Sequence, residues 1–217
     1  MLRARGLLVE RDSVSGSSAL RPRFTGQLQL MKRRIRVVEH NPSWKSQFEE
    51  LRAVFVRQLN GLFEHIEHVG STSVPGLAAK PILDVVVVIE SRTRLTAVTE
   101  RLGILGYEHE GDLGVRGREA FGPGDGSCPR VDPPTTWPRH HLYVCDRRNA
   151  ELERQLLFRD WLRAHPIDAE RYGSLKRELA EQHPHDIRAY TDGKANFVEQ
   201  TLRLASADNN WRPPVGS

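Results

Sequence analysis

The sequence contains little cysteine and no hydrophobic run long enough to span a bilayer. The two cysteines, Cys128 and Cys145, cannot form the disulfide framework of a small secreted protein, and they fit a reducing compartment. The longest apolar run, 82–89, is interrupted by Asp84 and is far too short for a transmembrane helix. The apolar core of a signal peptide is also missing. We therefore expect a cytoplasmic protein without a membrane partner.

Aromatic residues and lysine-rich runs are scarce as well. Aromatic side chains make up 7% of the chain and mostly fall at core spacing, so the sequence lacks the stacking platform of a single-strand binder. The formal charge of +4 and the pI of about 9.3 favour anionic partners, yet no basic run supports binding of a duplex. The composition thus favours a small anionic molecule over nucleic acid.

The chain is nevertheless well supplied with core residues. Of its 217 residues, 38% are hydrophobic and 28% charged, which predicts one folded domain with a small annex. We assign that domain to 32–206 and expect a disordered extension over 1–31 and a disordered tail over 207–217. The extension is rich in arginine and serine without apolar periodicity. It resembles a transit peptide apart from its acidic residues, and we favour Met31 as the true start.

The most informative stretch is HVGSTSVPGLAAKPILDVVVV, from His68 to Val88. It is typical of a strand, a turn of small residues, a short helical bridge and a buried strand. The turn offers hydroxyls and backbone N–H groups that can bind an anion, and a lysine suits phosphate. The candidate phosphate-binding residues here are Gly70, Ser71, Thr72, Ser73 and Lys80. Asp84 is a candidate metal ligand. A tight turn with a capping acid is the alternative.

Hydrophobic periodicity and capping residues place the remaining elements. The run 82–89 is almost continuously β-branched, which predicts a central strand covered on both faces. Asn41, Asn149 and Asp168 are typical helix caps. The region 111–138 is rich in glycine and proline and predicts a long irregular segment. We expect strands at 35–38, 63–69, 82–89, 107–109, 116–121 and 140–145, and helices at 41–62, 92–105, 149–165, 168–182 and 191–205.

The stretch from His68 to Val88 resembles the signature of the GrpB family. Further blocks agree with that family: RHHLYVC at 139–145, LFRDWLRAHP at 157–166, and then Tyr172, Leu175, Lys176, Asp186, Tyr190, Lys194 and Phe197. The resemblance covers about 35–205. It implies an α+β fold with a nucleotidyltransferase-like mixed sheet flanked by helices and further helices at the C-terminal end.

The resemblance also adds candidates to the site. In a nucleotidyltransferase-like sheet, the strand at 140–145 would lie beside the Asp84 strand, so His141 or Tyr143 would face the cleft. A structural role for His141 stays open. Four basic residues in the family blocks would line an anion pocket against the Gly70 turn, namely Arg159, Arg163, Lys176 and Lys194. The alternative for these residues is a solvated helix face.

The acidic residues depart from the pattern that the resemblance implies. The superfamily pattern has Gly-Ser, then two acids on one strand and a third on its neighbour, which together hold two metal ions. Asp84 fits the first acid, but Val86 occupies the position of the second. The neighbouring strand offers His141, with Asp146 just beyond. We therefore expect an atypical site, in which Asp84 would be the ligand of any Mg²⁺ or Mn²⁺.

Two functions from different classes follow. The first is a protein that binds a nucleotide or a CoA-like phosphorylated metabolite, with Asp84 and His141 as catalytic residues of an atypical nucleotidyl or phosphoryl transfer. Whether the protein is an enzyme stays open. The second is a non-catalytic accessory module that assists a partner such as dephospho-CoA kinase, to which some family members are fused. A basic cleft converging on Asp84 favours the first function, and an exposed apolar patch favours the second.

Overall fold

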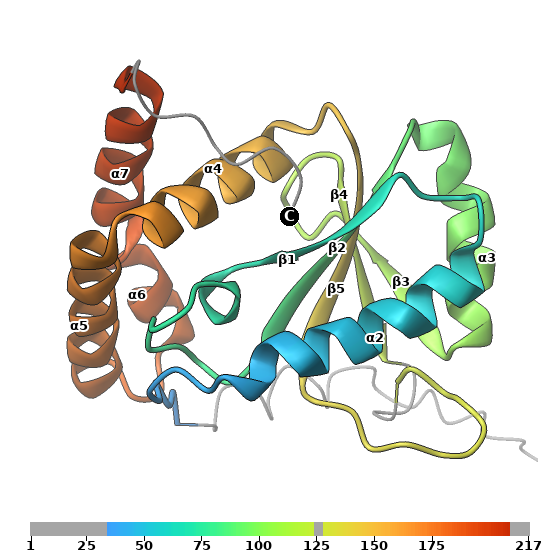
Figure 1. Ribbon diagram of the computed structural model, residues 1–217, viewed down its shortest axis with the longest axis horizontal. Coiled ribbons are helices and arrows are strands. Elements are labelled where there is room, and N and C mark those ends of the chain that lie inside the picture. The colour runs from blue at the N-terminus through green and yellow to red at the C-terminus, as the bar shows by residue number, and fades with distance from the viewer. Residues whose placement is uncertain (1–33, 124–127, 209–217) are drawn as a thin grey trace, which may run out of the picture. The chain divides into compact units, whose positions relative to one another are not determined.

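A five-stranded mixed sheet forms the centre of the protein (Figure 1). The computed structural model describes residues 34–123 and 128–208, which belong to one unit, Arg34–Ser217. The predicted extension 1–31 and residues 209–217 of the predicted tail lie outside the described residues. The expected disorder of both ends therefore stays a prediction.

The strands lie side by side in an order that differs from their order along the chain. From one edge to the other they are β1 (His65–Val69), β2 (Leu83–Ile89), β5 (His140–Asp146), β4 (Arg118–Pro123) and β3 (Tyr107–Gly111). Strands β2 and β5 are parallel, and the other neighbours are antiparallel. The register places Asp84 between Val69 and His141. The predicted α+β class with a mixed sheet is confirmed, as is the contact between β2 and β5.

Helices cover both faces of β2. On the face of Val85 lie α2 (Ser43–Leu59) and α3 (Leu95–Ile104), whereas α4 (Ala150–Ala164) covers the face of Val86 (Figure 1). A strand buried on both faces needs an apolar side chain at nearly every position, since neighbours along it point to opposite sides. This requirement explains the β-branched run and confirms that β2 is central.

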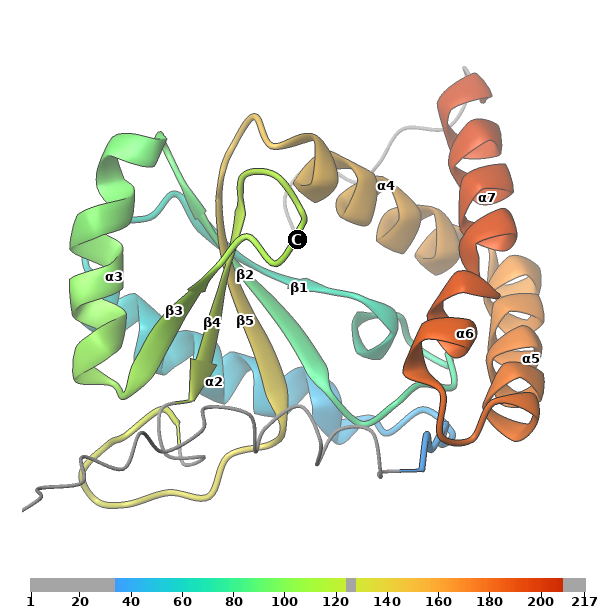
Figure 2. The ribbon, with the colours of Figure 1, turned by 180° about the vertical axis from the view of Figure 1, so that it is seen from behind.

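The C-terminal third adds three helices, α5 (Pro166–Gln182), α6 (Ile187–Asp192) and α7 (Ala195–Ala207). Both ribbon views place them on the opposite side of the sheet from α3 (Figures 1 and 2). Helices α5 and α7 pack on the end of α4 through a cluster that includes Trp161, Leu162, Tyr172, Phe197 and Ala205, and α6 packs on α5 through Tyr190. The prediction of a helical C-terminal third is confirmed.

Three predicted elements need correction. Helix α5 begins at Pro166 and not at Asp168, because proline fits the first turn of a helix. The single helix predicted at 191–205 is wrong, because α6 ends at Asp192 and α7 begins after Gly193, a residue of low helix propensity. The strand predicted at 35–38 is reduced to one isolated bridge, from Val38 to Ala79.

In the segments 34–123 and 128–208, no helix combines the length and hydrophobicity that a membrane span requires.

Asn149 provides a test of how firmly α4 is anchored. Its side-chain oxygen accepts from the N–H groups of Glu151 at 3.0 Å and Leu152 at 3.1 Å, and its amide donates to the Arg116 carbonyl at 3.2 Å. We expect Asn149→Ala to lower the free energy of unfolding by about 1–2 kcal/mol, measured by urea denaturation. Asn149→Asp keeps the cap acceptor and should cost less. Equal stability of Asn149→Ala and the parent protein would show that the cap contributes nothing.

Candidate functional site

The turn after β1 brings the backbone against Asp84. Gly70 has a φ of 71°, in the left-handed region that favours glycine. A Cβ atom at this position would overlap the Asp84 carboxylate. Gly70 therefore serves two purposes, since it allows the turn and also allows the close approach of the turn to β2.

The three hydroxyls of the turn have different surroundings. The Thr72 hydroxyl lies 3.0 Å from Nε2 of His68, and both side chains are buried. Ser73 donates to the Gly70 carbonyl at 2.6 Å. Ser71 makes neither contact and lines the pockets described below. The structure thus leaves Ser71 as the hydroxyl best placed for a ligand, while the side chains of Thr72 and Ser73 hold the turn.

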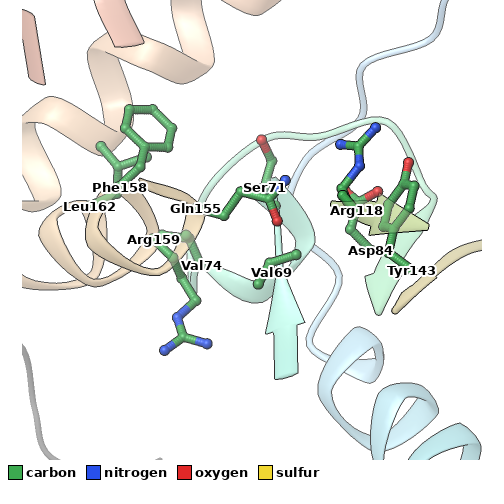
Figure 3. Close-up of a pocket in the computed structure, with 11 residues that line it drawn as sticks. Val69, Ser71, Val74, Asp84, Arg118, Tyr143, Gln155, Phe158, Arg159 and Leu162 are labelled. Atoms are coloured by element: carbon green, nitrogen blue, oxygen red, sulfur yellow. The ribbon is translucent and has the colours of Figure 1, made fainter. Parts of the chain in front are cut away.

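Arg159 of α4 is bound by protein oxygens on several sides. It donates to the Glu67 carboxylate at 2.7 Å, to the Asp160 carboxylate at 2.7 Å and to the His68 carbonyl at 3.1 Å. The side chain is only 6% exposed. Figure 3 shows its guanidinium turned away from Asp84. Its role in binding phosphate stays a prediction, and its contacts are those of a structural ion pair.

Arg163, one helical turn later, holds the same turn. Its guanidinium donates to the Ser73 carbonyl from two nitrogens, at 3.0 and 3.1 Å, and lies 3.4 Å from the Asp160 carboxylate. Arg159 and Arg163 were predicted from the sequence to line an anion pocket. In the structure they hold the backbone of 68–73 against α4, and Arg159 also lines the smaller of the two pockets described below.

Asp84 and His141 form a hydrogen-bonded pair at the start of their strands. Nδ1 of His141 lies 2.9 Å from Oδ1 of Asp84. Because an ionised carboxylate only accepts, Nδ1 carries the proton, and Nε2 of the neutral ring is left as an acceptor. The His141 side chain is 48% exposed, so the pair is accessible from solvent.

The Asp84–His141 pair lies between two adjoining pockets, which we treat as lobes of one cleft. The larger one, the lysine lobe, has a volume of about 460 Å³ and includes His141 in its lining. The smaller one, the small lobe, has a volume of about 160 Å³ and is drawn in Figure 3. Gly70, Ser71 and Asp84 line both lobes. The turn after β1 thus forms the waist of the cleft.

Three lysines converge on the lysine lobe. The ammonium groups of Lys194 and Lys80 lie 4.6 and 5.6 Å from the centroid of the Tyr190 ring. The ammonium group of Lys176 lies 4.6 Å from the centroid of the Tyr172 ring. Aromatic faces attract cations, so the rings keep three like charges close together. The predicted phosphate ligands Lys80, Lys176 and Lys194 are therefore brought together with Asp84.

Burial depresses the pKa of all three lysines. Burial, together with repulsion from Lys194 and Arg177, lowers the pKa of Lys176 to about 7. Burial and repulsion from Lys80 lower the pKa of Lys194 to about 8, although Asp84 opposes the shift. Burial also lowers the pKa of Lys80, again against Asp84. Burial and mutual repulsion make the charged form of each lysine unfavourable in this lobe. An anion among them would offset that repulsion, so its binding would be favourable.

Comparison with known proteins assigns the family. The GrpB family profile, described as "GrpB protein", matches residues 34–204. This chain belongs to the GrpB family. It is 35% identical to UPF0157 protein YqkA of Bacillus subtilis (strain 168), in a match that covers 82% of this chain and half of YqkA. A crystal structure of the conserved protein GrpB from Enterococcus faecalis is 34% identical, with a TM-score of 0.66, and the match covers 78% of this chain and 96% of that one.

Two further similarities are more distant. A dephospho-CoA kinase of Mycolicibacterium paratuberculosis (strain ATCC BAA-968 / K-10) is 25% identical in a match that covers 85% of this GrpB chain and 50% of the kinase. A crystal structure of the Cid1 poly(U) polymerase with MgGTP bound is 13% identical, with a TM-score of 0.48, over 66% of this chain and 44% of Cid1. Such a low likeness to Cid1 transfers no function.

The donor set of this GrpB protein does not fit a pair of metal ions held by carboxylates. Val86 is buried in the apolar cluster under α4. Asp146 lies at the opposite end of β5 from His141, about 16 Å away at the rise of a strand. Within 34–123 and 128–208, no group of three or more His, Cys, Asp or Glu side chains could hold a metal. Asp84 as a ligand of Mg²⁺ or Mn²⁺ stays a prediction.

Arg118 and Phe158 line the cleft but are not among the site residues predicted from the sequence. Arg118 lines the small lobe because β4 pairs with β5 and sets Arg118 opposite Cys145, on the face of Tyr143. No short-range pattern in the sequence encodes that register. Phe158 lines both lobes and lies inside a family block, beside Arg159. Family blocks could have singled out Phe158, but not Arg118.

Arg159→Leu tests whether this arginine is structural. Removing it takes the 2.7 Å ion pair from the partly buried Glu67 carboxylate and leaves the buried Asp160 carboxylate with the longer contact to Arg163 at 3.4 Å, which should cost about 3–5 kcal/mol and lower the Tm by roughly 6–20 °C. The control is Arg94→Leu, which removes an exposed pair with Glu90 and should change stability by less than about 0.5 kcal/mol. An unchanged Tm in Arg159→Leu, combined with loss of phosphate binding, would instead assign Arg159 to the ligand.

Proposed function

We propose that this GrpB protein binds a phosphorylated small molecule, either a nucleotide or a CoA-like metabolite, in the lysine lobe. The proposal is carried by one observation: Lys80, Lys176 and Lys194 converge on the lobe that also contains Asp84 and His141. A phosphate dianion placed among the ammonium groups would relieve their mutual repulsion. Ser71 lies at the waist of the cleft and would donate its hydroxyl to the same anion.

We further propose the chemistry that such a ligand would meet. The Nδ1–H group of His141 donates to the Asp84 carboxylate, so Nε2 can take a proton from a substrate hydroxyl. The hydroxyl oxygen then forms a bond to phosphorus, and the bond from phosphorus to the leaving oxygen breaks. Asp84 stabilises the imidazolium, and the lysines offset the charge on the phosphoryl oxygens. This assigns Asp84 and His141 to an atypical phosphoryl or nucleotidyl transfer.

The alternative is an accessory module that assists a partner protein. The similarity to half of a dephospho-CoA kinase favours it, because a matched segment of a longer enzyme can serve that enzyme without its own chemistry. The two functions require different parts of the protein surface. A ligand-binding protein needs the lysines of the cleft, whereas an accessory module needs only its outer surface.

Thermal shift of the full chain tests ligand binding. The panel is ATP, CTP, GTP, UTP, CoA and dephospho-CoA, each with and without Mg²⁺ or Mn²⁺. A ligand at a hundred times its Kd should add about 2.7 kcal/mol, which raises the Tm by roughly 5–10 °C. We expect a selective rise that Lys194→Met abolishes and that Lys45→Met, on the exposed side of α2, leaves unchanged.

Each outcome of that panel has a consequence. A shift that needs the divalent ion and disappears in Asp84→Asn would make Asp84 a metal ligand. A shift without the ion would show that the lysines alone neutralise the phosphate. If no compound shifts the Tm, the ligand proposal is wrong and the accessory role takes its place.

The depressed lysine pKa values predict how binding depends on pH. A bound dianion raises the pKa of Lys176 from about 7 and that of Lys194 from about 8, so the complex takes up protons between about pH 7 and 9. The affinity for a phosphate ligand should therefore fall as the pH rises from 7 to 9. Isothermal titration calorimetry in buffers of different ionisation enthalpy measures the protons directly. Lys194→Met should reduce the uptake, and zero uptake in the parent protein would contradict the assignment.

A further inference from the structure

Arg118 differs from the other arginines around the cleft because its guanidinium has no hydrogen-bonding partner among the described residues. Its Nε is buried and makes no hydrogen bond. By contrast, Arg159 and Arg163 are bound by carboxylate and carbonyl oxygens. A buried donor without a partner costs free energy, and the cost is recovered when a ligand supplies the acceptor.

Tyr143 holds Arg118 in an orientation that suits an anion. The guanidinium carbon of Arg118 lies 4.2 Å from the centroid of the Tyr143 ring. Figure 3 shows both side chains beside Asp84 at the edge of the small lobe. Contact with a ring face fixes a guanidinium while leaving its N–H edges for an oxyanion, which it can bind with two parallel hydrogen bonds.

The two lobes therefore present positive charge on both sides of one acid. The lysine lobe carries Lys80, Lys176 and Lys194, and its two further acids, Glu151 and Asp192, are paired with Arg154 and Arg188. The small lobe carries Arg118 and the ion-paired Arg159, and Asp84 lines both lobes. An anionic group directly over Asp84 would be repelled, but a neutral group with a hydroxyl could donate to the Asp84–His141 pair. Within the described part of the chain, cations without a carboxylate partner thus lie on both sides of the Asp84–His141 pair.

We propose that Arg118 binds a second anionic group of the ligand whose phosphate occupies the lysine lobe. The ligand class is then a small molecule with two anionic ends joined by a neutral, hydroxyl-bearing bridge, such as a sugar ring. The bridge crosses the waist formed by Gly70 and Ser71 and lies over the Asp84–His141 pair. This inference rests on the proposed function, since it takes the lysine lobe as the first phosphate site.

Matched ligand pairs test this inference on the full chain by calorimetry. The pairs are adenosine 5′-monophosphate with adenosine 3′,5′-bisphosphate, and fructose 6-phosphate with fructose 1,6-bisphosphate. In the parent protein, we expect the second phosphate to tighten binding by about ten-fold or more in at least one pair, as charge-assisted hydrogen bonds imply. In Arg118→Met, the preference should fall below about two-fold, with the Kd of the monophosphate unchanged.

Control variants separate this inference from the proposed function. Lys194→Met should weaken both members of a pair to a similar extent, and Arg94→Met, which lines neither lobe, should change neither. If Arg118→Met fails to fold, Arg118→Lys keeps the charge but loses the paired N–H edges, and it should reduce the preference in part.

The outcomes are distinct. Binding of monophosphates that depends on Lys194, with no preference for bisphosphates, would overturn the role of Arg118 and leave the proposed function standing. A bisphosphate preference that survives in Arg118→Met would also overturn that role. If no ligand of either kind binds the parent protein, both the proposed function and this inference are wrong.

Discussion

The cleft depends on the buried guanidinium of Arg159. This group joins the Glu67 side chain and the His68 carbonyl of β1 to Asp160 of α4. Because these partners lie more than ninety positions apart in the chain, the ion pair fixes how α4 sits on the sheet. Phe158 on the same helix lines both lobes. The position of the α4 wall of the cleft therefore depends on this buried ion pair.

The buried lysines of the lysine lobe destabilise the folded protein because their charges are incompletely compensated. Arg159 does not, because carboxylates neutralise it. Arg159 meets carboxylates, whereas Lys176 meets the Ala78 carbonyl and the Tyr172 ring and keeps a depressed pKa. Buried groups that are incompletely compensated tend to occur at functional sites, where ligand binding recovers the cost. This contrast within one cleft is the physical reason for assigning Arg159 to stability and Lys176 to binding.

The Asp84–His141 pair replaces the multiple acids of the pattern that the sequence resembles. Val86 points into the apolar cluster beneath α4, so an acid there would need a different packing of that helix. His141 occupies the position on β5 directly opposite Asp84 and donates to it. A neutral imidazole beside one carboxylate is suited to acid–base chemistry, and in the proposed function the cations of the cleft would offset the charge of a phosphate.

Apart from the isolated bridge at Val38, the start of α5 and the break between α6 and α7, the helices and strands could be predicted from the sequence, as could the central position of β2 and the turn at Gly70. These features depend on local patterns: β-branched runs, capping residues and a glycine at a positive φ. Tertiary structure alone decided which cations face the cleft. Arg159 and Lys176 both lie in family blocks, yet Glu67 neutralises one of them and not the other. Arg118 joins the cleft only through the register of β4 on β5, since strand pairing joins residues that are distant in sequence.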